Sequence, residues 1–185
     1  MSEEVLNKLI EGCKAGERRC QHKLYNLLTK KMYGVCLRYA KDSIEAEDIL
    51  QDGFIKVFTK MNQFSFSGSF EGWVRRIMVN TALEYYRRSS KMHSVGEIEE
   101  AKDELASEEI MSNINAQELI GLIQSLPVGY RTVFNLYAIE GYSHKEIAGK
   151  LEVTESTSKS QFARAKVALQ GMIIKKDQNF KYGRS

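Results

Sequence analysis

Residues 44–61, IEAEDILQDGFIKVFTKM, hold the pattern from which the rest of the chain can be interpreted. Apolar side chains recur here at the helical spacing, so the segment is predicted to be one helix with a buried stripe. The stripe consists of Ala46, Leu50, Phe54, Val57 and Met61. The opposite face carries Asp48, Gln51, Asp52, Ile55 and Thr59. Asp42 is expected to cap this helix, with Glu45 as its reciprocal partner.

Two interpretations of the outer face are open. It can be a solvated surface with one exposed isoleucine, since single exposed apolar side chains are common. It can instead be a docking face, where Asp48, Gln51 and Asp52 attract a basic protein and Ile55 is the apolar anchor. The rest of the chain has to decide between these two interpretations.

The composition is typical of a globular protein, with 185 residues, 43% hydrophobic and 28% charged. Nearly every long segment repeats at the helical spacing and none shows sustained alternation, so the fold class is predicted to be all-α. No apolar run approaches the ~20 residues needed to cross a bilayer. The acidic N-terminus lacks the apolar core of a signal peptide, so we expect a cytoplasmic protein.

Charge divides the chain into blocks. Residues 1–91 hold 16 basic and 11 acidic side chains, and residues 119–185 hold 10 and 5, so each block has a net charge of +5. Residues 92–118 hold 1 basic and 8 acidic side chains. We therefore predict two basic helical domains, 1–91 and 116–175, an acidic flexible linker over 92–115 and a basic tail over 176–185.

Residues 62–88 suggest a surface for single-stranded nucleic acid. A loop rich in serine and phenylalanine, residues 62–70, precedes a helix predicted from Glu71 to about Arg88. One helix face carries Trp73, Arg76, Asn80, Glu84 and Arg87. Bases stack on aromatic rings at ~1–3 kcal/mol each, and arginines hold the backbone. The alternative is that Trp73 is a half-buried core residue and the arginines are solvated.

Residues 143–172 match a helix-turn-helix. Ser143 and Glu146 form a predicted capping box, Glu152 and Val153 make the turn, and Thr154 caps a second helix. The outer surface of that helix, which suits a major groove and its phosphates, carries Ser156, Thr157, Lys159, Ser160 and Arg164. A helical hairpin that only packs is the alternative. The preceding segment, Val128 to Glu140, is predicted to be one helix that buries Val133, Phe134, Leu136, Tyr137 and Ile139.

No catalytic constellation is evident. The three histidines, His22, His93 and His144, have no partner by spacing, and we expect no enzyme activity, cofactor or small-molecule substrate. Cys13, Cys20 and His22 fit no zinc spacing, so no metal site is expected.

The order of these parts resembles bacterial RNA polymerase sigma factors of the extracytoplasmic-function (ECF) branch. Residues 46–58, AEDILQDGFIKVF, are similar to the most characteristic sigma motif in region 2, and residues 125–169 resemble region 4. The resemblance implies a promoter-recognition subunit without its own active site. It also implies three partners: core RNA polymerase, promoter DNA and an anti-sigma protein that is commonly membrane-linked.

The resemblance also implies roles for named residues. The residues implied to dock on the β′ clamp helices are Asp48, Gln51, Asp52 and Ile55. The residues implied to open the −10 element are Phe64, Phe66, Ser67, Trp73, Arg76, Asn80 and Arg87. The residues implied to read the −35 element are Ser156, Thr157, Lys159, Ser160 and Arg164. The resemblance also implies that the β flap of the polymerase is a partner.

Several positions depart from the family pattern, among them Gln161 and Phe162, which stand where Arg-Leu is common. Glu152 stands where the turn often has glycine, and a positive φ there costs on the order of 1 kcal/mol. Ser158 replaces a usual valine, and its hydroxyl is expected to bond back to the carbonyl of Thr154. Gly53 is expected to weaken the docking helix slightly.

Other functions remain as rivals. A stand-alone helix-turn-helix regulator would use only the C-terminal half, and a pure interaction module would bind protein through both halves. A nucleic-acid-modifying enzyme is the third rival, and it lacks any visible chemistry.

Overall fold

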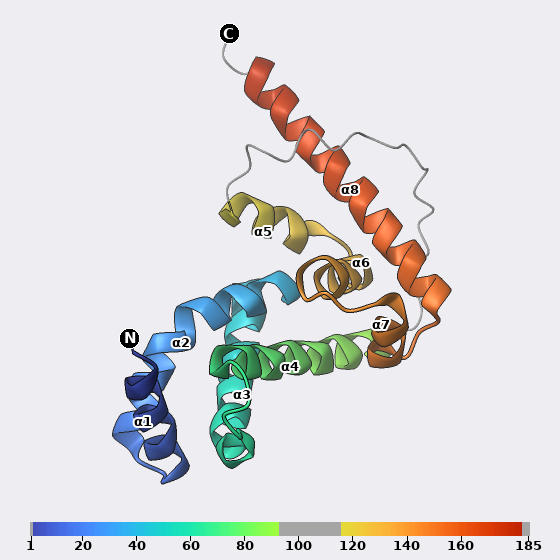
Figure 1. Cartoon of the computed structure of the whole chain (residues 1–185). Helices are drawn as coiled ribbons and strands as arrows, with labels where there is room; N and C mark the ends of the chain where they lie inside the picture. The colour runs from blue at the N-terminus through green and yellow to red at the C-terminus, as the bar shows by residue number, and fades with distance from the viewer. Residues whose placement is uncertain (1, 93–115, 183–185) are drawn as a thin grey trace. The chain divides into compact units, whose positions relative to one another are not determined.

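The computed structural model describes residues 2–92 and 116–182, and all regular structure within these ranges is helical (Figure 1). The all-α prediction is therefore confirmed. The chain divides into two compact units, Met1–Tyr85 and Tyr86–Ser185. The predicted acidic linker lies outside the described residues, except Met92, which ends a helix. No helix in the described ranges is long and apolar enough to span a membrane.

The first unit is built around one long helix with a partner on each side. Helix α2 (Arg18–Tyr39) packs against both α1 (Glu3–Lys14) and α3 (Ser43–Thr59). Figure 1 shows α1 and α2, both in blue, running next to each other. The short 3-10 helix η1 (Met61–Gln63) follows α3, and α4 (Phe70–Met92) begins within this unit and continues beyond it.

Helix α3 has the predicted amphipathic form, with two differences. Its buried side includes the predicted Ala46, Leu50, Phe54 and Val57, and also Ile49. Met61 is buried as predicted, but it belongs to η1. At the N-terminus the Asp42 carboxylate accepts the Glu45 amide at 2.8 Å, as predicted. The Glu45 carboxylate accepts the amide of Lys41 rather than that of Asp42.

Gly53 allows α4 to approach α3 closely. A Cβ atom at position 53 would overlap Sδ of Met78, which is fully buried on α4. Any larger residue would push the two helices apart or displace this side chain. The glycine therefore has a packing role beside its small cost in helix propensity.

The second unit gathers its helices around α8 (Glu155–Tyr182). Helices α5 (Ala116–Ser125), α6 (Val128–Phe134) and α7 (His144–Leu151) all pack against it. The core residues that meet here are Ile123, Leu126, Ala165 and Leu169. Helix α8 is regular up to Tyr182, so residues 176–182 of the predicted tail are helical.

The segment predicted as one helix over Val128–Glu140 changes its winding in the middle. Helix α6 ends at Phe134, and a π-helical turn, η3 (Asn135–Ile139), continues it. Val133 and Leu136 are fully buried as predicted, but Tyr137 is 39% exposed, so its predicted burial is wrong. The wider π turn rotates the following side chains, and the Tyr137 ring stacks on His144 at 4.3 Å instead.

Candidate protein-docking and nucleic-acid surfaces

Four residues on the outer side of α3 make up the surface predicted for docking, named the docking face from here on: Asp48, Gln51, Asp52 and Ile55. Asp48 and Gln51 are exposed, and Ile55 presents 64% of its surface to solvent. An apolar side chain this exposed, with carboxylates beside it, has the composition of a small protein-binding patch. The face is thus accessible, which the docking interpretation requires.

Asp52 differs from its neighbours because it is half-buried. The Tyr85 hydroxyl on α4 donates a hydrogen bond to Oδ2 of Asp52 at 2.8 Å. One turn further along α3, the Lys56 ammonium contacts the Glu84 carboxylate at 2.7 Å and the Thr81 hydroxyl at 3.2 Å. Two polar links therefore join the helix of the docking face to α4.

The sequence interpretation missed Ile44 as a surface residue. Ile44 is 72% exposed in the first turn of α3. It precedes Ile55 by eleven positions, close to three turns of ~3.6 residues, so both side chains project from the same side. The sequence did contain an indication of this exposure, because Ile44 is an apolar residue close to the N-cap that does not belong to the predicted buried stripe.

The loop after η1 forms an aromatic cluster. Phe64 is only 5% exposed, and its ring lies 5.0 Å from Phe70, 5.2 Å from Phe66 and 5.6 Å from Trp73. Phe66 is 41% exposed, and the Lys14 ammonium lies 4.2 Å from its ring centre. Phe64 is thus the buried ring against which Phe66, Phe70 and Trp73 pack, whereas the Phe66 ring is partly exposed at the surface.

Phe66 adopts an unusual backbone conformation. Its φ of +59° is in the left-handed region, which a bulky residue rarely occupies and which costs roughly 1–2 kcal/mol. Gly68, two positions later, has a φ of +98° without such a cost. The loop borders an open cavity of about 280 Å³, and α1 contributes Leu6 and Asn7 to its lining. Ser67 is exposed in the same loop.

The N-terminal part of α4 carries the remaining predicted residues of this surface. Trp73 is half-buried and stacks on Phe70 at 5.7 Å, so it is both a packing residue and partly accessible. Arg76 and Asn80 are exposed. Glu84 is engaged by Lys56, as described above, and Arg87 is half-buried on the part of α4 assigned to the second unit.

The helix-turn-helix is present as predicted. The Glu146 amide donates to Ser143 Oγ at 3.3 Å and the Ser143 amide donates to Glu146 Oε2 at 2.8 Å, which completes the capping box. Hydrogen bonds from Ser143 lower the pKa of Glu146. Glu152 has a φ of +58° at the turn, so the strained conformation expected there is real. The Thr157 amide donates to Thr154 Oγ1 at 3.0 Å and caps α8.

The outer side of α8 is hydroxylic and basic near its start. Ser156, Lys159 and Ser160 are exposed, and Thr157 and Arg164 are half-buried. Lys159 pairs with Glu155 one turn earlier at 2.8 Å, and this contact lowers the pKa of the Glu155 carboxyl. The hydroxyls of Ser156 and Thr157 hydrogen-bond with that of Thr154 at 2.8 and 2.7 Å, and the Ser160 hydroxyl donates to the Thr157 carbonyl at 3.0 Å. Each of these hydroxyls can still accept a further hydrogen bond.

The expectation for Ser158 is wrong, and so is the expectation that His144 lacks a partner. Ser158 is fully buried, and its hydroxyl hydrogen-bonds with Nδ1 of His144 at 2.9 Å. The imidazole is held between this hydroxyl and the rings of Tyr137 and Phe162. A serine in place of a branched apolar residue is therefore explained by a polar contact between α7 and α8.

The cysteines are free thiols. Burial raises the pKa of Cys13 to about 11 and that of Cys36 to about 12. The Cys20 thiol donates to a Glu17 carboxylate oxygen at 3.1 Å, while His22 pairs with Asn26. Among the described residues, no group of three or more histidine, cysteine or acidic side chains is placed to hold a metal ion.

One unit thus carries an exposed apolar side chain beside carboxylates, and the other carries a helix-turn-helix, a combination expected of a helical DNA-binding protein with a protein partner. Two family models match the chain: "Sigma-70 region 2" over residues 24–92 and "Sigma-70, region 4" over residues 116–169. The two matches lie on the two halves that carry the candidate surfaces.

Curated relatives agree with these models. The RNA polymerase sigma-H factor of Pseudomonas aeruginosa is 25% identical, with 91% of this chain and 94% of the relative covered. The ECF RNA polymerase sigma-E factor of Escherichia coli is also 25% identical, with 94% and 97% covered. The solved complex of the sigma factor RpoE with the anti-sigma factor NepR from Bartonella quintana matches at 20% identity and a TM-score of 0.49, covering 83% of this chain and 96% of that one.

The chain belongs to the ECF-type RNA polymerase sigma factors, with sigma-70 regions 2 and 4. It directs transcription initiation together with RNA polymerase, and it is a non-catalytic subunit. The three rival functions, stand-alone regulator, pure interaction module and modifying enzyme, are therefore wrong.

Proposed function

We propose that the docking face binds the clamp helices of the polymerase β′ subunit and thereby attaches this sigma factor to core polymerase in the cytoplasm. The observation that carries this proposal is the exposed Ile55, with Asp48, Gln51 and Asp52 beside it on one side of α3. An apolar anchor with charged side chains beside it is typical of small interfaces, in which the charges add selectivity for the partner. Ile44 extends the same patch by three helical turns.

The loop residues Phe64–Phe70 and the first turns of α4 hold the non-template strand of the −10 element in this proposal. The cavity of about 280 Å³ beside Phe66 is large enough for a base turned out of its stack. Phe66, Ser67, Trp73, Arg76 and Asn80 are at least partly accessible, and Arg87 would hold the backbone further along α4. Phe64 acts from beneath the surface by fixing the rings of Phe66 and Trp73.

Helix α8 reads the −35 element in the same scheme. Its first turns present Ser156, Thr157, Lys159, Ser160 and Arg164, and the capping box of α7 fixes the helix that precedes the turn. Region 4 would rest on the β flap. An anti-sigma protein is a further proposed partner, which would act by covering the docking face.

The decisive test is Ile55→Asp, which replaces the apolar anchor of the docking face with a third carboxylate. We expect the variant to fold, because Ile55 is exposed, and to lose core binding and promoter-directed transcript in a multi-round assay. Val5→Asp is the matched control, since Val5 is also an exposed apolar helix residue but lies on α1. Tight polymerase binding by folded Ile55→Asp would refute the docking assignment.

A further inference from the structure

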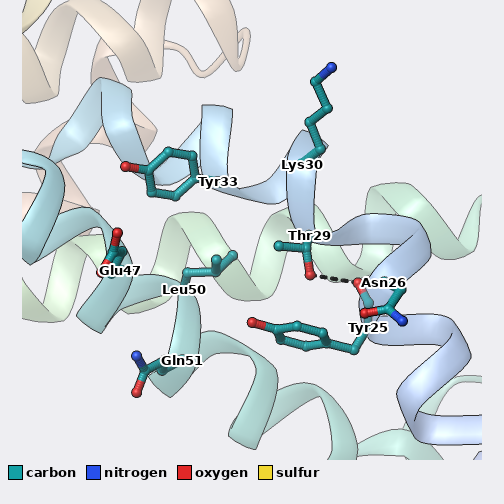
Figure 2. A pocket seen from close by; sticks show the side chains of 8 residues that line it. All are labelled: Tyr25, Asn26, Thr29, Lys30, Tyr33, Glu47, Leu50 and Gln51. Atoms are coloured by element: carbon teal, nitrogen blue, oxygen red, sulfur yellow. Dashed lines mark hydrogen bonds between the residues drawn. The ribbon is translucent and has the colours of Figure 1, made fainter.

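A groove between α2 and α3 lies next to the docking face (Figure 2). It has a volume of about 570 Å³, and its lining includes Tyr25, Thr29, Tyr33, Glu47, Leu50 and Gln51. Gln51 belongs to both the groove and the docking face, and Glu47 immediately precedes Asp48. A partner seated on Asp48 and Ile55 would therefore meet the mouth of this groove.

The aromatic wall of the groove is already fixed in the free protein. The Tyr25 ring packs against Phe54 with 4.6 Å between ring centres, and Phe54 is itself buried. Leu50, which is only 5% exposed, lies between the two tyrosines at the base of the groove in Figure 2. A preformed wall reduces the ordering cost that a bound side chain would otherwise impose.

The polar groups of the groove favour a cation. Glu47 is exposed, and its carboxylate makes no hydrogen bond or ion pair within the described part of the chain. Gln51 adds an amide oxygen beside it. Lys30 also borders the groove, but Figure 2 shows its side chain directed away from Leu50 and Tyr25, and the residue is exposed. The interior is thus aromatic on one side and acidic on the other.

We propose that this groove receives an arginine side chain of the polymerase subunit that docks on α3, an inference that rests on the proposed docking function. A guanidinium is planar and weakly hydrated, so it can stack on Tyr25 or Tyr33 while it donates to the Glu47 carboxylate. The compact, strongly hydrated ammonium of lysine matches this combination less well. Helix α2 thereby becomes part of the polymerase interface, and the groove adds selectivity beside the Ile55 anchor.

Affinity for core polymerase tests the acidic side of the groove. Glu47→Gln keeps the shape and removes the charge, so we expect core binding to weaken about tenfold, with a larger loss for Glu47→Arg. Glu11→Gln is the control, because Glu11 is an exposed glutamate on α1 whose removal changes the net charge equally. Wild-type affinity of Glu47→Gln and Glu47→Arg, with Ile55→Asp still inactive, would overturn the groove proposal and leave the docking face intact.

Photocrosslinking identifies the occupant directly. Replacing Tyr33 with p-benzoylphenylalanine in the holoenzyme should give a crosslink to an arginine-containing segment of the β′ subunit, located by mass spectrometry. The same replacement at Ile55 tests the docking face independently. A crosslink to a segment without arginine, to a second copy of this chain, or to nothing while position 55 still crosslinks, would overturn the proposal.

Discussion

The hydroxyl of Tyr85 donates a 2.8 Å hydrogen bond to Asp52, and this bond joins the helix of the docking face to the helix that carries Trp73 and Asn80. The Lys56–Glu84 ion pair joins the same two helices. A polymerase that engages Asp52 acts on a carboxylate already bound to α4. The position of the proposed DNA-melting helix is therefore mechanically linked to the proposed docking face.

A double-mutant cycle measures this link. Tyr85→Phe and Asp52→Ala should each lower the free energy of unfolding, because each removes the partly buried hydrogen bond between the Tyr85 hydroxyl and the Asp52 carboxylate. Their effects should be non-additive by about 1 kcal/mol, since the same bond is lost in both. Urea denaturation of the four proteins gives the coupling. Additive effects would show that the contact contributes nothing to stability.

Asn80→Ala should impair promoter opening more than initial binding. Asn80 is exposed on α4, so the substitution leaves packing unchanged, while loss of one bidentate base contact costs about 1–3 kcal/mol. We expect roughly tenfold less permanganate reactivity in the −10 region. A pre-melted template should restore transcription by the variant. Equal permanganate reactivity of variant and wild type would remove Asn80 from the opening surface.

Glu152→Gly should stabilise the second unit by on the order of 1 kcal/mol, because glycine occupies positive φ without the steric cost that a side chain pays. Gly141→Ala is the opposite control, since Gly141 has a φ of +77° and open space around it, so the added methyl group costs strain alone. Thermal denaturation should give a higher Tm for the first variant and a lower Tm for the second. A lower Tm for Glu152→Gly would contradict this account of the turn.

Alkaline pH should destabilise the first unit through its buried thiols. Cys36 has a pKa of about 12 in the folded chain against an ordinary value of 9.0, so the unfolded chain loses this proton first as pH rises. Stability is thus fully present below pH 9 and falls toward pH 12. Between about pH 8 and pH 10 the loss from this thiol is about 1 kcal/mol. Cys36→Ala should show a shallower decline in urea unfolding, and an unchanged slope would exclude the thiol as the cause.

The sequence predicted best where the signal was local. The capping box of Ser143 and Glu146 and the Thr154 cap depend on residues three apart, so their geometry follows once a helix begins. The exposed position of Ile55 followed from helical periodicity in the same way. The sequence raised a positive φ at Glu152 only as a condition, because the family often has glycine there, and the structure has this conformation.

Contacts between distant segments were the ones missed. Ser158 and His144 are fourteen positions apart and meet only because α7 packs on α8. Tyr85 and Asp52 lie 33 positions apart. The π turn at η3 exposed Tyr137, although the apolar pattern predicted burial, because the helical period itself changed there. The spacing of apolar residues in the sequence indicates neither these two hydrogen bonds nor the change of helical period.

By itself, the sequence determined the helical class, the charged outer side of α3 and the two motifs that mark regions 2 and 4. These features depend on side-chain spacing along single helices, which periodicity and caps record. Tertiary structure alone decided that Gly53 makes room for Met78, that Phe64 lies beneath Phe66, and that α2 and α3 enclose a groove. Those relationships depend on how far apart two helices pack, and that distance is set by the side chains of both helices together.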